Sequence, residues 1–354
     1  MTFGPESLRI QSQRMVTVRN IEDAVARQLV RGWARAWDQA ATDLQGALLD
    51  ASSRASSGER LSWRQVNRIE RFQAALNRLA ANLDDLAAAG RVEIVNAAEE
   101  AVQVAREMQP RLIASQMPAV GQSTVELARQ LEGRVAGESL DAIVARAQER
   151  IVSRMQPLPA ETMAQVRRSL VQGITVGDNP RETARRMLQR VEGRFGGGLT
   201  RALRIARTEQ LDAMRTADQT IAQTNGEVLR EMVWTSALDE RTCSACAAMH
   251  GQTFPVGTFG PAGHVNCRCS FVPRTKSWRE IGFDVDEPPD IFPDRDQWFE
   301  GLSRQRKVDM MGPTRLEAFE SGQVGWDDLV RRVENPDWRA SYQTTTVESL
   351  GVAA

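Results

Sequence analysis

The chain has 354 residues, of which 42% are apolar and 26% are charged, and its formal net charge is −1. This composition is typical of a folded protein of one large domain or two domains and excludes a disordered chain. A charge so close to zero gives no indication of a globally basic nucleic-acid-binding protein.

No apolar run approaches the roughly 20 residues needed to span a bilayer. Residues 1–19 lack the apolar core of a signal peptide. We therefore expect no membrane partner and a protein that is made and folded in a cytoplasm. Disulfides rarely persist there, so clustered cysteines favour a metal.

The N-terminal part is predicted to be helical. Residues 1–17 show no periodicity and are predicted to form a flexible arm. Beyond them apolar residues recur at the spacing of amphipathic helices. We take Gly90 and Pro110 as helix ends and assign residues 18–155 to a helical domain. Its predicted helices span residues 21–48, 62–90, 92–108, 123–135 and 138–155.

Residues 156–275 are predicted to form a module in which helices give way to strands. Helices are expected at 160–172, after a capping box at Asn179–Glu182, and at 199–224. Alternating side chains then predict a strand over 227–235 and shorter strands near 253–254 and 271–272.

The C-terminal part is predicted to be a linker followed by a tail. Residues 276–297 include an acidic, Pro-rich stretch and are predicted to be an extended linker. Residues 298–354 regain the helical pattern, which fades beyond Pro336. The expected helices of this tail span residues 298–310, 313–321 and 326–333.

All four cysteines and both histidines lie within residues 243–269. Their order is Cys-x-x-Cys, a loop rich in Gly and Pro, and then His-x-x-Cys-x-Cys, which can present four N or S ligands to a structural zinc ion. We expect Cys267 and Cys269 to be alternates that point to opposite sides of the segment. His250 is the least suitable ligand, because a turn is expected there. The candidate metal ligands are Cys243, Cys246, His264, Cys267 and Cys269.

Other interpretations of this cluster stay open. One is a reduced thiol cluster without a metal, and another is thiol exchange at the Cys-x-x-Cys pair. A catalytic zinc site is less favoured, because it needs a nearby general base and no His-Glu pattern is present. We assign no catalytic residue and no bound organic cofactor. The predicted fold class is mainly α, with a helical N-terminal region and an α+β C-terminal module that contains a small zinc-stabilised β element.

The cluster and its surroundings resemble the phage Mu F-like minor head protein family, also called the head morphogenesis family. The resemblance covers about residues 155–335. Gly263 departs from the family pattern, in which proline often precedes the histidine. The residues that carry the resemblance are Trp234-Thr235, Asp239–Cys246, Gly251, Phe254, Gly263–Cys269, Arg207-Thr208-Glu209 and the tail Trp298–Gly322.

This resemblance implies a minor capsid component of a tailed phage. Such a protein binds the portal oligomer inside the procapsid and aids head assembly, DNA packaging or DNA ejection. It is made in the host cytoplasm and is present in few copies in the virion, inside the head and near the portal. Other head proteins and packaged DNA are further expected partners, and a small-molecule substrate is not expected. Because the chain ends soon after the conserved module, we expect no enzyme domain of the kind that some relatives carry.

Two other functions remain as alternatives, a zinc-containing nucleic-acid-binding protein and a nuclease or toxin that uses Arg207 and Glu209. We expect these two residues instead to form polar contacts that fix their helix to the zinc module. Asp239 is expected to turn the chain into the first cysteine pair, and Trp234 to anchor the core. Arg268 lies between two candidate ligands and is expected to screen the negative charge of the site.

Overall fold

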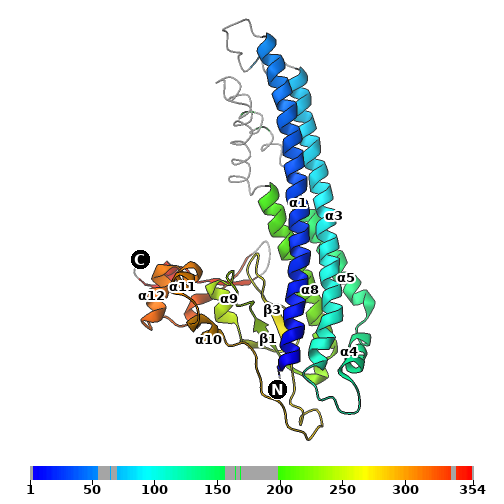
Figure 1. Ribbon diagram of the computed structural model, residues 1–354, viewed down its shortest axis with the longest axis vertical. Coiled ribbons are helices and arrows are strands. Elements are labelled where there is room, and N and C mark those ends of the chain that lie inside the picture. The colour runs from blue at the N-terminus through cyan, green and yellow to red at the C-terminus, as the bar shows by residue number, and fades with distance from the viewer. Residues whose placement is uncertain are drawn as a thin grey trace. The chain divides into compact units, whose positions relative to one another are not determined.

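The computed structural model describes residues 3–54, 70–155, 198–335 and 340–352, together with the single residues 64, 164 and 168. Helices dominate these ranges, and the strands form two small antiparallel sheets in the C-terminal part (Figure 1). The predicted fold class is therefore confirmed. No helix in the described ranges is long and apolar enough to cross a membrane.

The chain divides into two compact units. We call Met1–Arg19, Ala98–Ala145 and Leu211–Ala354 the sheet unit, and Asn20–Ala97 with Arg146–Gln210 the helix unit. Each unit combines separated stretches of the chain, whereas the predicted domains are consecutive. The units therefore do not test the predicted domain bounds, which stay a prediction. Four helices contribute residues to both units, namely α1 (Pro5–Arg54), α3 (Glu70–Ala114), α5 (Gly137–Arg154) and α8 (Gly198–Thr224).

The first helix begins much earlier than the sequence pattern indicates. α1 starts at Pro5, so the prediction of a flexible arm over residues 1–17 is wrong. Ile10, Arg14 and Val18 are buried at intervals of four residues, which is the spacing of one helix face. Arg14 stands in the middle of this face and interrupts its apolar pattern. Apolar periodicity alone therefore does not predict a helix here.

Gly90 lies inside a helix rather than at its end. The predicted helices 62–90 and 92–108 are replaced by α3, which runs without a break from Glu70 to Ala114 and contains Pro110. Within the helix unit, a Cβ added at Gly90 would lie 3.1 Å from a Leu29 methyl carbon and 3.3 Å from the Met155 methyl carbon. The glycine therefore permits close packing of neighbouring helices and does not end this one.

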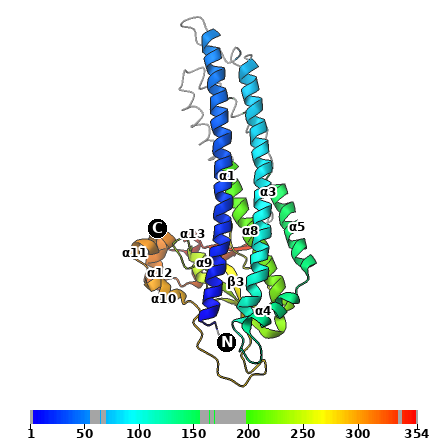
Figure 2. The ribbon, with the colours of Figure 1, turned by 45° about the vertical axis from the view of Figure 1, so that its right-hand side comes forward.

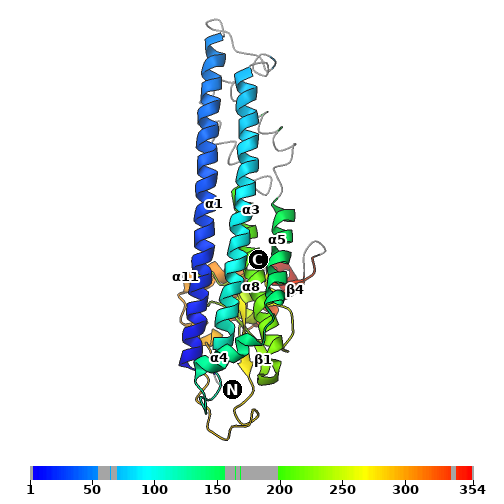
Figure 3. The same cartoon turned by 90° about the vertical axis from the view of Figure 1, so that its right-hand side faces the viewer.

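The sheet unit is built around a three-stranded antiparallel sheet in the order β2-β1-β3. The predicted strands are confirmed, although β1 starts two residues later than expected, after the short 3-10 turn η1 (Gly226–Val228). α4 (Thr124–Gly133) packs beside the C-terminal end of α8 (Figure 3), where the Asn225 side-chain amide donates to the Leu131 carbonyl at 3.2 Å. The strands are β1 (Leu229–Thr235), β2 (Thr253–Phe254) and β3 (Ser270–Thr275).

Trp234 anchors the core of the sheet unit, as predicted. Its side chain is 1% exposed, and its ring centroid lies 6.2 Å from that of Phe254, 6.1 Å from Phe271 and 5.7 Å from Tyr342. Three surrounding aromatic rings in tilted and edge-to-face arrangements each add to the stabilisation from buried area. The strand that leads into the first cysteine pair therefore has a fixed position.

The segment after the sheet runs without helix or strand from Lys276 to Asp294. The helices α10 (Arg295–Glu300), α11 (Arg304–Met311) and α12 (Pro313–Glu320) follow. The predicted helix over 298–310 is divided into α10 and α11 by residues 301–303, whereas α12 lies close to the predicted 313–321. Figures 1 and 2 show these three short helices grouped beside α9 (Ser244–Met249). Their apolar faces form a small core around Phe299 and Leu316.

The end of the tail differs from the prediction. The expected helix over 326–333 is instead a 3-10 turn, η2 (Asp327–Leu329), and strand β4 (Val330–Val333). β4 pairs with β5 (Ser341–Thr344), and the helix α13 (Val347–Leu350) follows. β-branched residues at both ends of β4 favour the strand, and the stretch is too short for its periodicity to decide between the two. The predicted capping box at Ser62, the helices at 160–172 and after Asn179, and Gly196–Gly197 of the triple-glycine joint lie outside the described residues.

Candidate metal centre

The first cysteine pair is presented by a tight turn that leads into α9. Asp239 accepts a hydrogen bond from the Arg241 backbone N–H at 2.9 Å, and the Asp239 N–H donates to the Thr242 hydroxyl at 3.0 Å. The predicted role of Asp239 in turning the chain is therefore confirmed. Cys243 is the N-cap of α9, and its sulfur accepts from the Cys246 N–H at 3.4 Å. Both thiols consequently lie at the start of one helix.

The second half of the cluster returns on a constrained loop. The Cys267 N–H donates to the His264 carbonyl at 3.0 Å, and Asn266 between them has a left-handed φ of 64°, a conformation that asparagine tolerates better than most residues. A Cβ at Gly263 would lie 2.7 Å from the Cys267 Cβ and closer still to its sulfur. A side chain at this position would therefore force the loop or the Cys267 side chain to shift.

Donor atoms of the two halves converge. The His264 Nε2 lies 3.2 Å from the Cys243 sulfur and 3.3 Å from the Cys246 sulfur, and the sulfurs of Cys246 and Cys267 are 3.7 Å apart. Tetrahedral zinc coordination places two sulfurs about 3.8 Å apart and a sulfur and a nitrogen about 3.6 Å apart. The separations are therefore close to those of a metal site. All four cysteines are free thiols.

The donors form two overlapping groups that share Cys246. Cys243, Cys246 and His264 form one, and Cys246, Cys267 and Cys269 form the other, with the atoms of each within 4.8 Å of one another. A cavity of about 30 Å³ adjoins both groups and is also lined by Arg268. A volume of this size admits one ion or one water. The residues therefore fit a single metal ion.

The expectation that Cys267 and Cys269 point to opposite sides is wrong. Their sulfurs are within 4.8 Å of each other and of the Cys246 sulfur. Side chains alternate along an extended chain, so residues two apart share a side. The two thiols differ instead in their partners. Cys267 accepts from the Cys269 N–H at 3.4 Å, whereas the Cys269 sulfur lies 3.3 Å from the Ser236 hydroxyl.

In the first group, the pKa values favour a thiolate at Cys243 next to a protonated His264. The pKa of Cys243 is lowered to about 4, because Cys246 donates to its sulfur and because His264 lies beside it, although burial opposes the shift. The pKa of His264 is raised to about 9, chiefly by its hydrogen bond with Cys243. Thiolate is the form in which cysteine binds metals, so a positive charge at this point suits the site.

His250 lies outside both donor groups, in agreement with the expectation that it is the least suitable ligand. Its Nδ1 accepts from the Ser236 N–H at 3.0 Å, and its Nε2 donates to the Pro293 carbonyl at 2.9 Å. The ring also stacks on Phe292 with centroids 5.1 Å apart. Burial lowers the pKa of His250. This neutral histidine therefore holds the Pro-rich segment against the strand end instead of contributing to the cluster.

The helix that carries Arg207 and Glu209 reaches the cluster through a different residue. Within the helix unit, Arg207 ion-pairs with Glu22, and Glu209 with Arg150 and Arg154, so the two residues join α8 to α1 and α5. The expectation that they form polar contacts is confirmed, and their contact with the cysteine module stays a prediction.

Arg215 makes the contact between α8 and the cysteine module. Its guanidinium donates to the carbonyls of Cys267 and Cys269. The sequence gives no signal for this role, since arginines are mostly exposed. Only its contact with the Cys267–Cys269 segment distinguishes Arg215 from the other arginines of the helix.

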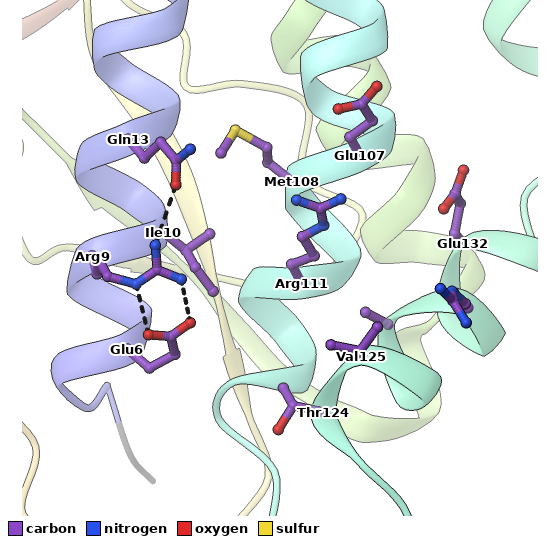
Figure 4. Close-up of a pocket in the computed structure, with 12 residues that line it drawn as sticks. Glu6, Arg9, Ile10, Gln13, Glu107, Met108, Arg111, Thr124, Val125 and Glu132 are labelled. Atoms are coloured by element: carbon purple, nitrogen blue, oxygen red, sulfur yellow. Dashed lines mark hydrogen bonds and ion pairs between the residues drawn. The ribbon is translucent and has the colours of Figure 1, made fainter.

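A larger hollow lies elsewhere in the sheet unit, between α1, α3 and α4 (Figure 4). It has a volume of about 460 Å³ and a partly apolar floor that includes Ile10 and Met108. At its edge Arg9 is held by Glu6 at 2.6 Å and by Gln13 at 3.4 Å. Its lining contains no cysteine or histidine, so this groove is separate from the metal centre.

Fold and site together define a helix-supported module in which two cysteine-containing turns meet at the end of a small sheet and form a Cys/His cluster that could hold a metal ion. Residues 164–272 match the family described as Phage Mu protein F like protein. This match supports the resemblance of this part of the chain to the phage Mu F-like family. Comparisons with curated proteins and with solved structures give no match.

Proposed function

We propose that the protein is a minor head protein of a tailed phage. The observation that carries this proposal is the family match over residues 164–272, which takes in α8, β1 and both halves of the cysteine cluster. The match supports a protein related to the phage head. Residues 1–163 lie outside it, so the proposed role rests on the C-terminal module.

We further propose that the protein binds the portal oligomer inside the procapsid and aids head assembly, DNA packaging or DNA ejection. The test is co-expression of the full chain with the portal protein encoded by the same phage, followed by purification through a tag on the portal. Co-purification of the chain, together with its detection in purified virions in few copies, supports the proposal. Absence from both the portal and the virion would overturn it.

We propose that the metal is a structural zinc ion held by Cys243, Cys246, His264 and Cys267. Three thiolates and one imidazole are a common structural zinc set, and the separations of these four donors carry the assignment. Elemental analysis of full-length protein purified without chelator tests it. About one zinc per chain is expected, and less than about half would refute a structural site, since binding and folding are coupled.

We propose that the protein is not an enzyme. The acid and base groups that a nuclease or toxin would need are engaged in structural contacts. Glu209 pairs with two arginines, and both nitrogens of His250 are used by backbone groups. Incubation with single- and double-stranded DNA and RNA should give no turnover. Hydrolysis that disappears in Glu209→Gln would contradict this part of the proposal and favour the nuclease alternative.

A further inference from the structure

Arg215 lies in the wall of the metal centre and is almost completely buried, with 3% of its surface exposed. Burial of an arginine is costly unless each of its charged N–H groups finds an acceptor. Arg215 sits on α8, while the cysteines that it approaches lie 52 and 54 residues further along the chain. Its contacts are therefore tertiary and specific to the folded module.

The guanidinium is directed at the backbone of the second half-site. Its Nη2 donates to the Cys267 carbonyl at 2.7 Å and to the Cys269 carbonyl at 2.6 Å, and its Nε donates to the Cys269 carbonyl at 2.9 Å. The Nη1 donates to Asp212, one turn earlier on α8, at 3.2 Å. Asp212 thus orients the guanidinium, and the guanidinium holds two alternate carbonyls of the Cys-x-Cys segment.

We propose that Arg215 is the positioning residue of the metal centre, fixing the backbone that carries Cys267 and Cys269 and balancing the charge of the bound site. This inference rests on the proposed metal centre. Zinc with three thiolates and one neutral imidazole has a net charge of about −1, and a buried cation nearby offsets it. Groups outside the ligand set that orient ligands in this way tune metal affinity.

The shape of the contact explains why the residue is arginine. The planar fork of a guanidinium donates in several fixed directions at once, whereas an ammonium is a compact point donor on a flexible stem. Three hydrogen bonds from Arg215 reach two carbonyls that are two residues apart. A lysine would keep the charge but would not hold both carbonyls in one geometry.

Arg14 of α1 offers a matched control, because it is a second buried arginine that contacts α8. It is also buried, and it pairs with Asp218 of α8 and with Gln109. Among the described residues, no cysteine forms a hydrogen bond or an ion pair with Arg14. Loss of Arg14 should therefore destabilise the sheet unit without altering the metal centre, which separates a positioning role from a general contribution to folding.

The experiment compares wild type, Arg215→Met, Arg215→Lys and Arg14→Met as full-length chains. Zinc affinity is measured by competition with a chromophoric chelator, and the ligand geometry by the absorption bands of the cobalt-substituted protein. Arg215→Met should bind zinc on the order of 10–100-fold more weakly than wild type and should show altered cobalt bands. Arg215→Lys should lie between the two, and Arg14→Met should match wild type in both measurements while unfolding at a lower temperature.

Different failures have different meanings. Wild-type affinity and cobalt bands in Arg215→Met would overturn the inference while leaving the metal centre intact. Equal loss of zinc in Arg14→Met and both Arg215 variants would also overturn it, because the effect would then reflect stability alone. If Arg215→Met does not fold, the comparison of Arg215→Lys with Arg14→Met decides by the same criteria. A wild-type chain that binds no zinc would instead refute the proposed metal centre on which the inference rests.

Discussion

Cys267 and Cys269 compete for one place in the metal centre, and their different partners indicate which of them binds. The Cys267 sulfur is 3.7 Å from that of Cys246, close to the separation of two zinc ligands, and it accepts a backbone N–H. The Cys269 sulfur lies beside the Ser236 hydroxyl. The backbone contact supports a thiolate at Cys267, and the hydroxyl satisfies Cys269 without a metal.

Serine substitutions at these two positions should therefore have unequal effects. We expect Cys267→Ser to lose stoichiometric zinc and Cys269→Ser to retain it, because only the first removes a donor from the tetrahedron. Zinc content after gel filtration gives the comparison, and Cys246→Ser serves as the positive control because its sulfur belongs to both donor groups. Retention of zinc by Cys267→Ser together with its loss from Cys269→Ser would reverse the assignment.

Gly263 is required for a steric reason. Any Cβ at this position would overlap Cys267, so the loop or the ligand must move. We expect Gly263→Ala to destabilise the protein by about 1–3 kcal/mol, the usual cost of overpacking, and to weaken zinc binding. Thermal unfolding and zinc competition measure the two effects.

Gly133→Ala is the control for the Gly263 substitution. An added Cβ meets no atom within 4 Å at Gly133, so this variant should be close to wild type in both measurements. A Gly263→Ala protein with unchanged stability and unchanged zinc affinity would show that the loop adjusts freely around the new methyl group.

The residues that form the Cys/His cluster were identifiable from the sequence, but the arginine that contacts their backbone was not. Cysteine and histidine are rare in this chain and confined to residues 243–269, so spacing alone predicts a cluster. Arg215 is one of many arginines. Its role follows from how α8 meets the Cys267–Cys269 segment, and such a long-range contact is not encoded in local spacing.

Helical elements were predictable where an apolar stripe is continuous and were missed where polar residues are buried. α4, α5 and α8 lie close to their predicted bounds. α1 extends further towards the N-terminus than predicted. The apolar pattern misses this part of the helix, because the polar residue Arg14 occupies a buried position on its inner face. α3 passes through Gly90, which sequence reasoning takes as a helix end. In both helices tertiary contacts decide the outcome over local preference.

The Arg14–Asp218 pair links α1 to α8 inside the sheet unit. Arg14 is fully buried and Asp218 nearly so, and burial lowers the pKa of Arg14 to about 10, which leaves it charged at neutral pH. Removal of one partner from a buried pair leaves the other charge uncompensated and costs about 3–5 kcal/mol. We therefore expect Arg14→Met to lower the free energy of unfolding by roughly this amount in denaturant titrations.

The double variant Arg14→Met/Asp218→Leu tests the cause of that loss. Removal of both charges should recover most of the stability, because apolar replacements of a buried pair are often neutral. If the double variant is as unstable as the sum of the two single variants, the pair contributes through packing rather than charge, and the electrostatic explanation of the α1–α8 contact is wrong.

At the scale of the whole molecule, we expect the proposed metal to act as a cross-link. It joins Cys243 to His264 across 21 residues of chain and so restricts the unfolded state as a disulfide around a loop of this length would, by roughly 3 kcal/mol. The loop contains β2 and the whole of α9, and both elements are too short to be stable on their own. We therefore expect the metal to stabilise this part of the sheet unit above all.

Removal of the metal should accordingly destabilise one part of the chain. Treatment with a chelator should raise amide hydrogen exchange in α9, β2 and β3, while exchange in Asn20–Ala97 of the helix unit stays unchanged. Cys246→Ser should already show the raised exchange and should not respond further to the chelator. If zinc is lost without any change in exchange around α9, the cysteine module is held together by the packing around Trp234 alone. If exchange rises equally in Asn20–Ala97, the metal stabilises both units, because they then unfold as a single cooperative system.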